Sequence, residues 1–189
     1  PKAASDSYIY DPRNAVPTVG GALCCNSRVF PWGPFDQRRV EGRHDVLVYS
    51  TDPLKKPVQV SGPIHVVLHV VTSAEDTDFT AKLVDVYPDG RAVILCDGIH
   101  RLRYRQGLER PADYIPGAVE RIDIDTGVTS NLFLAGHRIR VDVTSSNFPK
   151  YDRNLNTQAP LAEEKRLRIA RQEIRHGGEW DSHVLLPVV

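Results

Sequence analysis

Methionine is absent from the 189-residue sequence. Translation starts at methionine, so we expect this chain to be part of a longer protein or to have been processed. Residues Pro1 to Ser7 are small, polar or proline, and this composition predicts a linker rather than a folded first element. The sequence therefore indicates a domain taken from a larger protein.

An excess of charge of either sign is also absent, because 24 Lys and Arg residues balance 24 Asp and Glu residues. Proteins that bind nucleic acid or an anionic membrane surface usually carry a basic excess. The sequence has no run of about 18 apolar residues that could span a bilayer, and no charged-then-apolar signal peptide opens it. We expect neither nucleic acid nor membrane as a partner, and a homo-oligomer stays open.

Cysteine is scarce, and only Cys24, Cys25 and Cys96 are present. Adjacent cysteines rarely bridge each other, and an odd count without regular spacing is not a disulfide framework. A bridge from Cys96 to either of the other two stays open. Free thiols in a reducing compartment are the simpler interpretation, and they favour a cytoplasmic location over a secreted parent protein.

Motifs for catalysis and metal binding are missing too. The sequence contains no G-x-S-x-G, the turn that exposes a serine nucleophile. His65 and His69 would share one strand face, but roughly 13 Å along the strand is too far for one metal. The acidic loop Glu75 to Asp78 lacks the later glycine and glutamate of an EF-hand. We expect no catalytic residue, metal or cofactor, and we expect Asp76 or Asp78 to accept backbone N–H groups.

The sequence does show the regularly spaced turn residues that are typical of an all-β protein. Thirteen glycines and fourteen prolines divide the chain into short segments with apolar residues at every second position. Residues 64–71 and 79–87 alternate in this way, and Pro88-Asp89-Gly90 predicts a hairpin turn into 91–96. Many short strands with turns between them predict a sandwich or jelly roll. The other expected strands are 46–49, 119–124, 138–143 and 184–188.

The two ends of the chain are less regular. Residues 1–43 carry weak strand signals, and we expect 14–21 and 30–35 to form an extended segment that wraps the sandwich of residues 44–189. Residues 161–175 allow either a helix or a strand, because their apolar residues fit both periods.

Two polar stretches bear on function. Arg101, Arg103 and Arg105 would alternate on one strand face, and a solvated or salt-bridged face suits them better than an anion-binding stripe. Residues 145–157 combine Asn and Asp with Phe and Tyr, and Asn and Asp fix irregular loops by bonding to the local backbone. Arg153 is a natural bidentate partner for Asp152, for Asp142 or for an acid on another domain. The stretch predicts an ordered loop, either a structural corner or part of an interface.

A set of segments, weak singly and specific together, resembles a known family over nearly the whole chain. They are Asp11 to Gly21, Asp36 to Arg38, Asp45 to Tyr49, Gly62-Pro63, Asp76 to Val86, Pro88 to Arg91, Ala135 to Arg140 and Ser145 to Asn156. In these segments the chain is similar to the C-terminal domain of the X-Pro dipeptidyl-peptidase and cocaine esterase (CocE/NonD) group of serine hydrolases.

The resemblance implies a jelly-roll β-sandwich, of the galactose-binding-domain type, that follows an α/β-hydrolase catalytic domain in the same parent chain. The Ser, Asp and His of the catalytic triad belong to that hydrolase domain, so none is carried over to a residue here. Family members cleave acyl bonds in X-Pro dipeptides, esters and β-lactam side chains. Their C-terminal domain packs against the catalytic domain and can help wall its substrate pocket.

We therefore expect a non-catalytic accessory domain that stabilises a serine acyl hydrolase. Whether its loops line the active site or only support the catalytic domain is left open. The alternative is a carbohydrate-binding module, a frequent role of jelly rolls, which an aromatic content of 7% does not favour. The candidate contacts with the catalytic domain or its pocket rim are Asp76, Asp78, Phe79, Asn147, Phe148 and Arg153.

Overall fold

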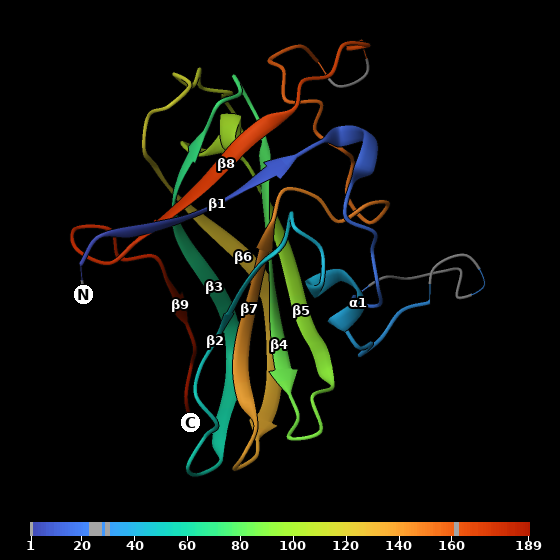
Figure 1. Cartoon of the computed structure of the whole chain (residues 1–189), viewed down its shortest axis with the longest axis vertical. Helices are drawn as coiled ribbons and strands as arrows, with labels where there is room; N and C mark the ends of the chain where they lie inside the picture. The colour runs from blue at the N-terminus through green and yellow to red at the C-terminus, as the bar shows by residue number, and fades with distance from the viewer. Residues whose placement is uncertain (1, 23–27, 29–30, 161–162) are drawn as a thin grey trace.

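The computed structural model describes residues 2–22, 28, 31–160 and 163–189. In this part of the chain, nine strands form two antiparallel sheets packed face to face (Figure 1). The first sheet has the strand order β1-β8-β3-β6 with β9 beside β3, and the second has the order β2-β7-β4-β5. The strands are β1 (Ala4–Tyr10), β2 (Leu47–Ser50), β3 (Val58–Thr72), β4 (Asp78–Val86), β5 (Ala92–Arg101), β6 (Glu120–Phe133), β7 (Arg138–Thr144), β8 (Ala170–His176) and β9 (His183–Leu185).

The first eight strands follow the path of a jelly roll. Among them only β4 and β5 are sequence neighbours within one sheet, and Pro88-Asp89-Gly90 forms the turn between them. Every other connection from β1 to β8 crosses from one sheet to the other. This double Greek-key arrangement confirms the predicted all-β jelly-roll sandwich. The short helix α1 (Arg38–Glu41) and two 3₁₀ turns at Pro12–Asn14 and Leu102–Tyr104 lie between strands.

The core forms because apolar residues alternate along β3 and β4. Val66 and Leu68 of β3 point between the sheets and pack with Phe79 and Leu83 of β4 in the main cluster of buried apolar residues. Burying side chains of this size contributes about 1.5–3 kcal/mol each. Strand β4 differs from an ordinary half-buried strand, because every residue along it is buried.

Residues that precede β2 cover the second face of β4. The backbone N–H of Gln37 donates to the carbonyl of Ala92 at 2.7 Å, and that of Ile94 donates to the carbonyl of Phe35 at 3.2 Å. Lys82, on the second face of β4, donates through Nζ to Gln37 Oε1 at 3.0 Å. The chain before β2 is therefore bound to the second sheet by main-chain and side-chain hydrogen bonds.

The predicted linker at residues 1–7 is wrong. Ala4–Tyr10 form β1, which pairs with β8 along its whole length. The strand escaped prediction because its first residues are polar and only Tyr8 and Tyr10 are buried. Because β1 belongs to the first sheet, part of the predicted segment 1–43 lies in the sandwich, and the division from 44–189 stays a prediction.

Two further segments are settled. The stretch left open between helix and strand ends in β8, a strand over Ala170–His176. The three arginines do not share a strand face, because β5 ends at Arg101 and a 3₁₀ turn over Leu102–Tyr104 follows.

In the described part of the chain, no helix has the length and apolarity needed to cross a bilayer. Cys96 is a buried free thiol, and Cys24, Cys25 and Phe30 fall outside the described residues.

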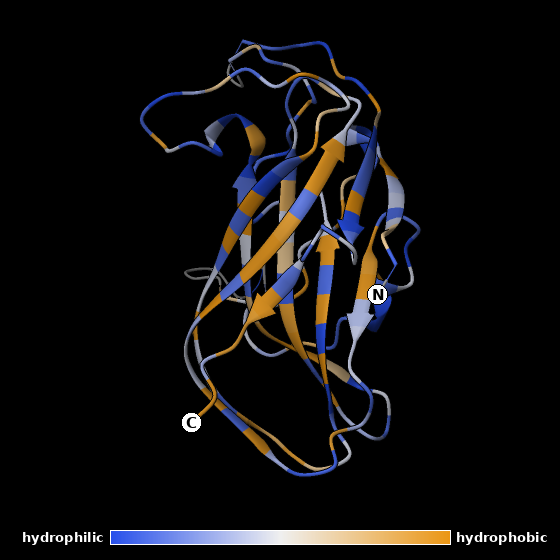
Figure 2. Cartoon of the chain, turned by 90° about the vertical axis from the view of Figure 1, so that its left-hand side faces the viewer, coloured by the Kyte–Doolittle hydropathy of each residue, from blue (hydrophilic) through white to orange (hydrophobic). Residues whose placement is uncertain are grey.

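The two long edges of the sandwich differ. At one edge β5 packs against β6 so closely that a Cβ on Gly98 would lie 2.1 Å from the carbonyl oxygen of Asp125. At the opposite edge β2 has four residues and β9 has three, and a cleft remains between the sheets. Figure 2 looks toward this side of the molecule, where apolar and polar residues alternate along the strands.

Candidate functional site

A cluster of buried and half-buried polar side chains closes the end of the sandwich where β4 begins; we call Asp76, Asp78, Arg101, Arg103 and Asn154 the polar corner. Asn154 Nδ2 donates to Asp76 Oδ2 and to Asp78 Oδ1, both at 2.9 Å. The two carboxylates and the amide are almost fully inaccessible to solvent. A single amide therefore joins the loop before β4 to the loop after β7.

Two arginines neutralise the carboxylates of the polar corner. Arg101 approaches Asp78 with two parallel hydrogen bonds of 2.8 and 2.9 Å. Arg103 donates its backbone N–H to Asp76 Oδ1 at 2.9 Å and its Nε to Asp76 Oδ2 at 2.8 Å. Burial raises the pKa of Asp78, and the hydrogen bonds from Arg101 oppose that rise. The prediction that Asp76 accepts a backbone N–H is confirmed. A bidentate arginine–carboxylate pair such as Arg101–Asp78 both stabilises the buried charge and fixes the orientation of the two side chains.

A second layer of hydrogen bonds lies next to the polar corner. Thr77 Oγ1 donates to Asn156 Oδ1 at 2.8 Å and accepts from Gln172 Nε2 of β8 at 2.7 Å. Asn156 has a φ of 62°, a left-handed conformation that asparagine tolerates better than most residues. Its Nδ2 donates to the carbonyl of Arg168 at 2.7 Å. The loop after β7 is thus held to both sheets.

The first half of that loop carries an exposed aromatic side chain. Phe148 exchanges backbone hydrogen bonds with Val16 at 2.9 Å and Thr18 at 2.7 Å, and its side chain is 42% exposed. The guanidinium of Arg153 lies 5.0 Å from the centre of the Phe148 ring, and its NH1 donates to the carbonyl of Pro12 at 3.1 Å. Phe148 and Arg153 therefore form an exposed pair on an anchored backbone.

A row of buried or half-buried charges runs across the second face of the second sheet. Lys82 of β4 lies opposite Asp142 of β7 on one side and Asp97 of β5 on the other. Asp97 accepts from Asn147 Nδ2 at 2.8 Å and from Lys150 Nζ at 2.7 Å. We call Asp142, Lys82, Asp97 and Lys150 the charged row. Its hydrogen bonds join the start of the loop after β7 to β5, and Lys82 and Asp142 continue the row from Asp97 onto the neighbouring strands β4 and β7.

Asp142 is the unbalanced member of the charged row. Within the described residues, both of its carboxylate oxygens are buried without a hydrogen-bond partner. Burial raises the pKa of Asp142 to about 7, and the nearby carboxylate of Glu41 adds to the rise. Lys82 and Arg140 act in the opposite direction. Burial also lowers the pKa of Lys82, so desolvation opposes the charged form of both groups.

Ser182, His69 and Asp181 lie close together but have the wrong connections for a catalytic triad. Ser182 Oγ donates to the carbonyl of Arg175 at 2.6 Å and accepts from the backbone N–H of His69 at 2.9 Å. The ring of His69 lies 3.9 Å from Asp181 and does not reach the hydroxyl through a hydrogen bond. In a Ser–His–Asp triad the histidine ring nitrogen is hydrogen-bonded to the serine hydroxyl and takes its proton. This serine is a structural link in the β8–β9 connection.

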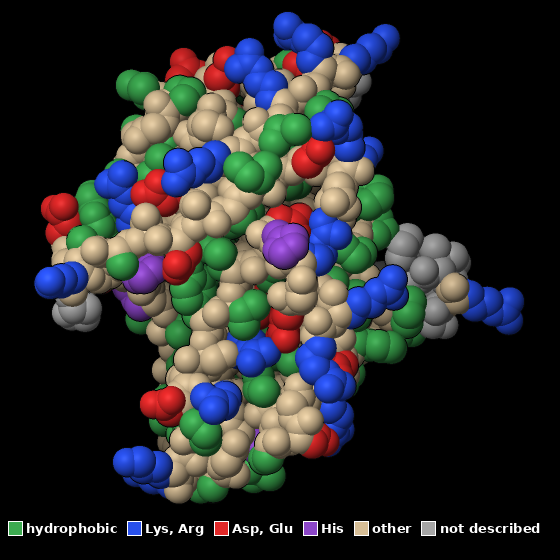
Figure 3. Space-filling model, in the orientation of Figure 1, with side chains coloured by type: hydrophobic (Ala, Val, Ile, Leu, Met, Phe, Trp, Pro, Cys, Tyr) green, Lys and Arg blue, Asp and Glu red, His purple; other side chains and the backbone are tan. Residues whose placement is uncertain are grey.

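Surface chemistry adds little to these clusters. In the part of the chain that the structure describes, no group of three or more His, Cys, Asp or Glu side chains could hold a metal ion. Figure 3 shows one face, on which basic and acidic side chains lie interspersed. A hollow of about 430 Å³ borders the polar corner and is lined by Tyr104, Leu108 and Tyr151, among others.

The six candidate contact residues divide into two sets. Phe148 and Arg153 are exposed and lie against each other. The other four are buried: Asp76 and Asp78 in the polar corner, Phe79 in the core, and Asn147 beside the charged row, where it bonds to Asp97. Contact with a neighbouring domain stays a prediction for all six.

Sequence reasoning missed the charged row. Lys82 lies between apolar residues at every second position, which is the pattern of a strand with one solvated face. The sequence feature that could have indicated burial of this face is the strand-poor stretch before residue 44. That stretch was expected to wrap the sandwich, but not to cover this face of β4.

Replacing Asn154 with alanine should lower the free energy of unfolding by about 2–3 kcal/mol, because two buried carboxylates each lose a donor. Asn131→Ala is the matched control, since the Asn131 Nδ2 is buried and makes no hydrogen bond in the described structure. Urea unfolding followed by circular dichroism measures both. Equal losses in the two variants would show that the amide bridge contributes nothing specific.

Asp142→Asn should stabilise the chain at neutral pH and have little effect near pH 4. The folded-state pKa of Asp142 is raised from 3.8 to about 7, so the native carboxyl loses stability as pH rises through that window. The advantage of the variant should grow to at most about 4 kcal/mol above pH 7.

The control is Asp89→Asn. Hydrogen bonds from Arg91 lower the pKa of this exposed carboxyl, so its contribution to stability changes with pH in the opposite direction. Unfolding curves between pH 4 and pH 8 test the pair. A stability difference for Asp142→Asn that stays constant across this range would contradict the assignment.

Comparisons with known proteins agree with this geometry. Residues 1–185 match the family model described as X-Pro dipeptidyl-peptidase C-terminal non-catalytic domain. The chain is 50% identical over 188 residues to the cocaine esterase of Rhodococcus sp. (strain MB1 Bresler), and this covers 98% of the chain but 32% of that protein.

Solved structures show the same fold within longer chains. An aminopeptidase from the marine sediment archaeon Thaumarchaeota archaeon superposes with a TM-score of 0.90 and 34% identity, over 100% of this chain and 34% of that one. An alpha-amino acid ester hydrolase superposes with a TM-score of 0.89 and 33% identity, over 98% and 32%. The chain spans about a third of the length of these relatives. It therefore belongs to the family of C-terminal non-catalytic domains of X-Pro dipeptidyl-peptidases.

Proposed function

We propose that this domain serves a serine acyl hydrolase, whose α/β-hydrolase catalytic domain precedes it in the same parent chain. In this role it stabilises the catalytic domain and helps wall the substrate pocket. The observation that carries the proposal is the family match over residues 1–185 to a C-terminal non-catalytic domain. The relatives that support it are an esterase, an aminopeptidase and an ester hydrolase about three times as long as this chain.

The exposed pair Phe148 and Arg153 is the contact that the proposal favours. A half-exposed aromatic ring with a guanidinium stacked on it is typical of residues that carry binding energy at interfaces. The loop that presents the pair is fixed at both ends, by Asn147 beside the charged row and by Asn154 in the polar corner. A rigid loop loses little conformational entropy on binding, which favours docking.

The buried candidates act in this proposal by holding the loop. Asp76 and Asp78 fix Asn154, and Phe79 ties the start of β4 to the core. Their side chains are inaccessible in the domain, so their effect on a catalytic neighbour passes through the backbone that they position. Phe148 and Arg153 are then the residues whose loss changes docking without changing the fold.

In the parent enzyme, Phe148→Ala and Arg153→Ala should each lower the temperature at which activity is lost, and should raise KM more than they lower kcat. Leu132→Ala is the matched control. Leu132 is also an exposed apolar residue, 50% exposed, but it lies on β6 in the first sheet. Thermal inactivation and steady-state ester hydrolysis measure both effects. Variants at positions 148 and 153 that behave like the Leu132 control would refute the assigned contact.

A further inference from the structure

The cleft at the open edge of the sandwich has the character of a binding site. It measures about 410 Å³ and lies between the two sheets, with Tyr49, His176 and His183 at its rim. Small-molecule and peptide side-chain sites are commonly apolar clefts of about 300–1,000 Å³ with a few polar groups. The apolar side chains lining it include Val66, Leu68, Ile139, Val141, Ile174 and Val184.

The cleft exists because the strands at this edge are short. β2 pairs with β7 on one side and, in the described structure, with no strand on the other. Among the described strands, β9 pairs with β3 alone, over three residues. At the opposite edge, by contrast, the backbone of β5 packs directly against β6 at Gly98. Core side chains such as Ile139 and Val141 therefore reach the opening and are each 8% exposed.

An unfilled apolar cleft is costly. Apolar side chains that line an open cleft lose the dispersion contacts that a packed neighbour would give and leave apolar surface accessible to water. An occupant with apolar side chains would therefore stabilise this edge. The free backbone groups of β2 would also accept an added extended segment, as edge strands do.

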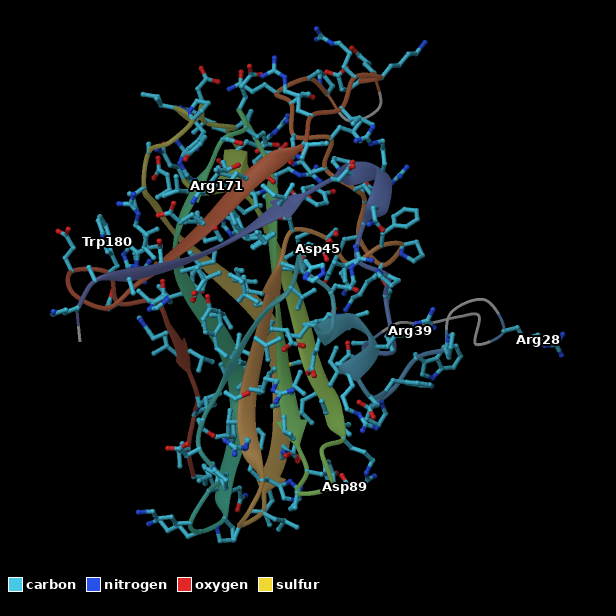
Figure 4. All side chains as sticks on the ribbon, in the orientation of Figure 1. Arg28, Arg39, Asp45, Asp89, Arg171 and Trp180 are labelled. Atoms are coloured by element: carbon cyan, nitrogen blue, oxygen red, sulfur yellow. The ribbon has the colours of Figure 1, made fainter. Side chains whose placement is uncertain are left out.

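The N-terminus lies beside this cleft. Ala4, the first residue of β1, pairs with His176, which stands at the cleft rim. Asp6 bonds to two rim residues, accepting from Tyr49 at 3.1 Å and meeting His176 Nε2 at 2.8 Å. Ala3 packs against Gly178 in the connection from β8 to β9, which also carries Trp180 (Figure 4). The described start of β1 therefore lies at the mouth of the cleft.

We propose that the residues immediately before Pro1 in the parent chain run along this edge in an extended conformation and insert apolar side chains into the cleft. The inference rests on the proposed function, because it takes the catalytic domain to precede Pro1. About 15 extended residues would span roughly 50 Å, which matches the 15-residue strand β3 that borders the cleft. The segment completes the core of the sandwich and fastens the catalytic domain to it.

The test compares three lengths of the chain: these 189 residues, the same chain with about 15 residues added upstream, and the full parent enzyme. Val184→Cys places a thiol in the cleft, and Ile99→Cys places one in the hollow at the opposite edge. Both wild-type residues are half-buried. Cys24 and Cys25 are replaced by serine, and the rate of reaction with a disulfide reagent is measured.

The thiol at position 184 should react about tenfold or more slowly once the short segment is added, because the reagent can then reach it only when the segment opens locally. Reaction at position 99 should not change on that addition. Equal rates at position 184 in the first two chains would overturn the inference. So would slowing only in the full parent enzyme, since the body of the catalytic domain would then cover the cleft.

Hydrogen exchange of the unmodified chains gives a second measurement that needs no substitution. Amides of β2 and β9 should gain protection on adding the short segment, whereas those of β5 should keep theirs. Unchanged exchange in β2 and β9 would overturn the inference. Neither measurement depends on catalysis, so a failure here is distinct from a failure of the proposed accessory role.

Discussion

The amide of Asn154 is the contact on which the rest of this structure depends. Two carboxylates, Asp76 and Asp78, are buried together at the end of the sandwich, and each would be strongly destabilising without donors. Arg101 and Arg103 supply charge, and Asn154 supplies the hydrogen bond that joins the two. Asn154 belongs to the loop after β7, so charge compensation at one end of the domain also sets the position of that loop.

Polar interactions define the second sheet in a way that apolar packing alone does not. β4 is buried on both faces, but one face packs against the core and the other carries the charged row. Apolar cores tolerate exchange of similar side chains, whereas a polar network is satisfied by few arrangements. The chain before β2 and the loop after β7 converge on this face, through Gln37 at Lys82 and Asn147 at Asp97. The exposed Phe148 and Arg153 are thereby presented on a backbone with little freedom.

The sequence allowed prediction of elements whose signal is local. The alternation of Ile64 to Val70, the Asp89-Gly90 turn and the alternation of Phe79 to Leu83 are such signals, and the structure confirms the strands and hairpin that they indicated. Long-range pairings could not be predicted, because Asn154 meets Asp76 across 78 positions of sequence. β1 was missed because a polar strand gains its place from pairing with β8, which nothing near it in the sequence announces.

The central claim is that this domain is an accessory part whose ordered loop stabilises a catalytic neighbour. Its most direct test is addition of the purified chain to a separately expressed catalytic domain of the parent enzyme. A partner that binds only the folded state at a hundredfold excess over its Kd stabilises it by about 2.7 kcal/mol. The account predicts that the unfolding temperature of the catalytic domain rises with added chain and that the Phe148→Ala chain gives a smaller rise. An unchanged unfolding temperature at saturating chain would contradict it.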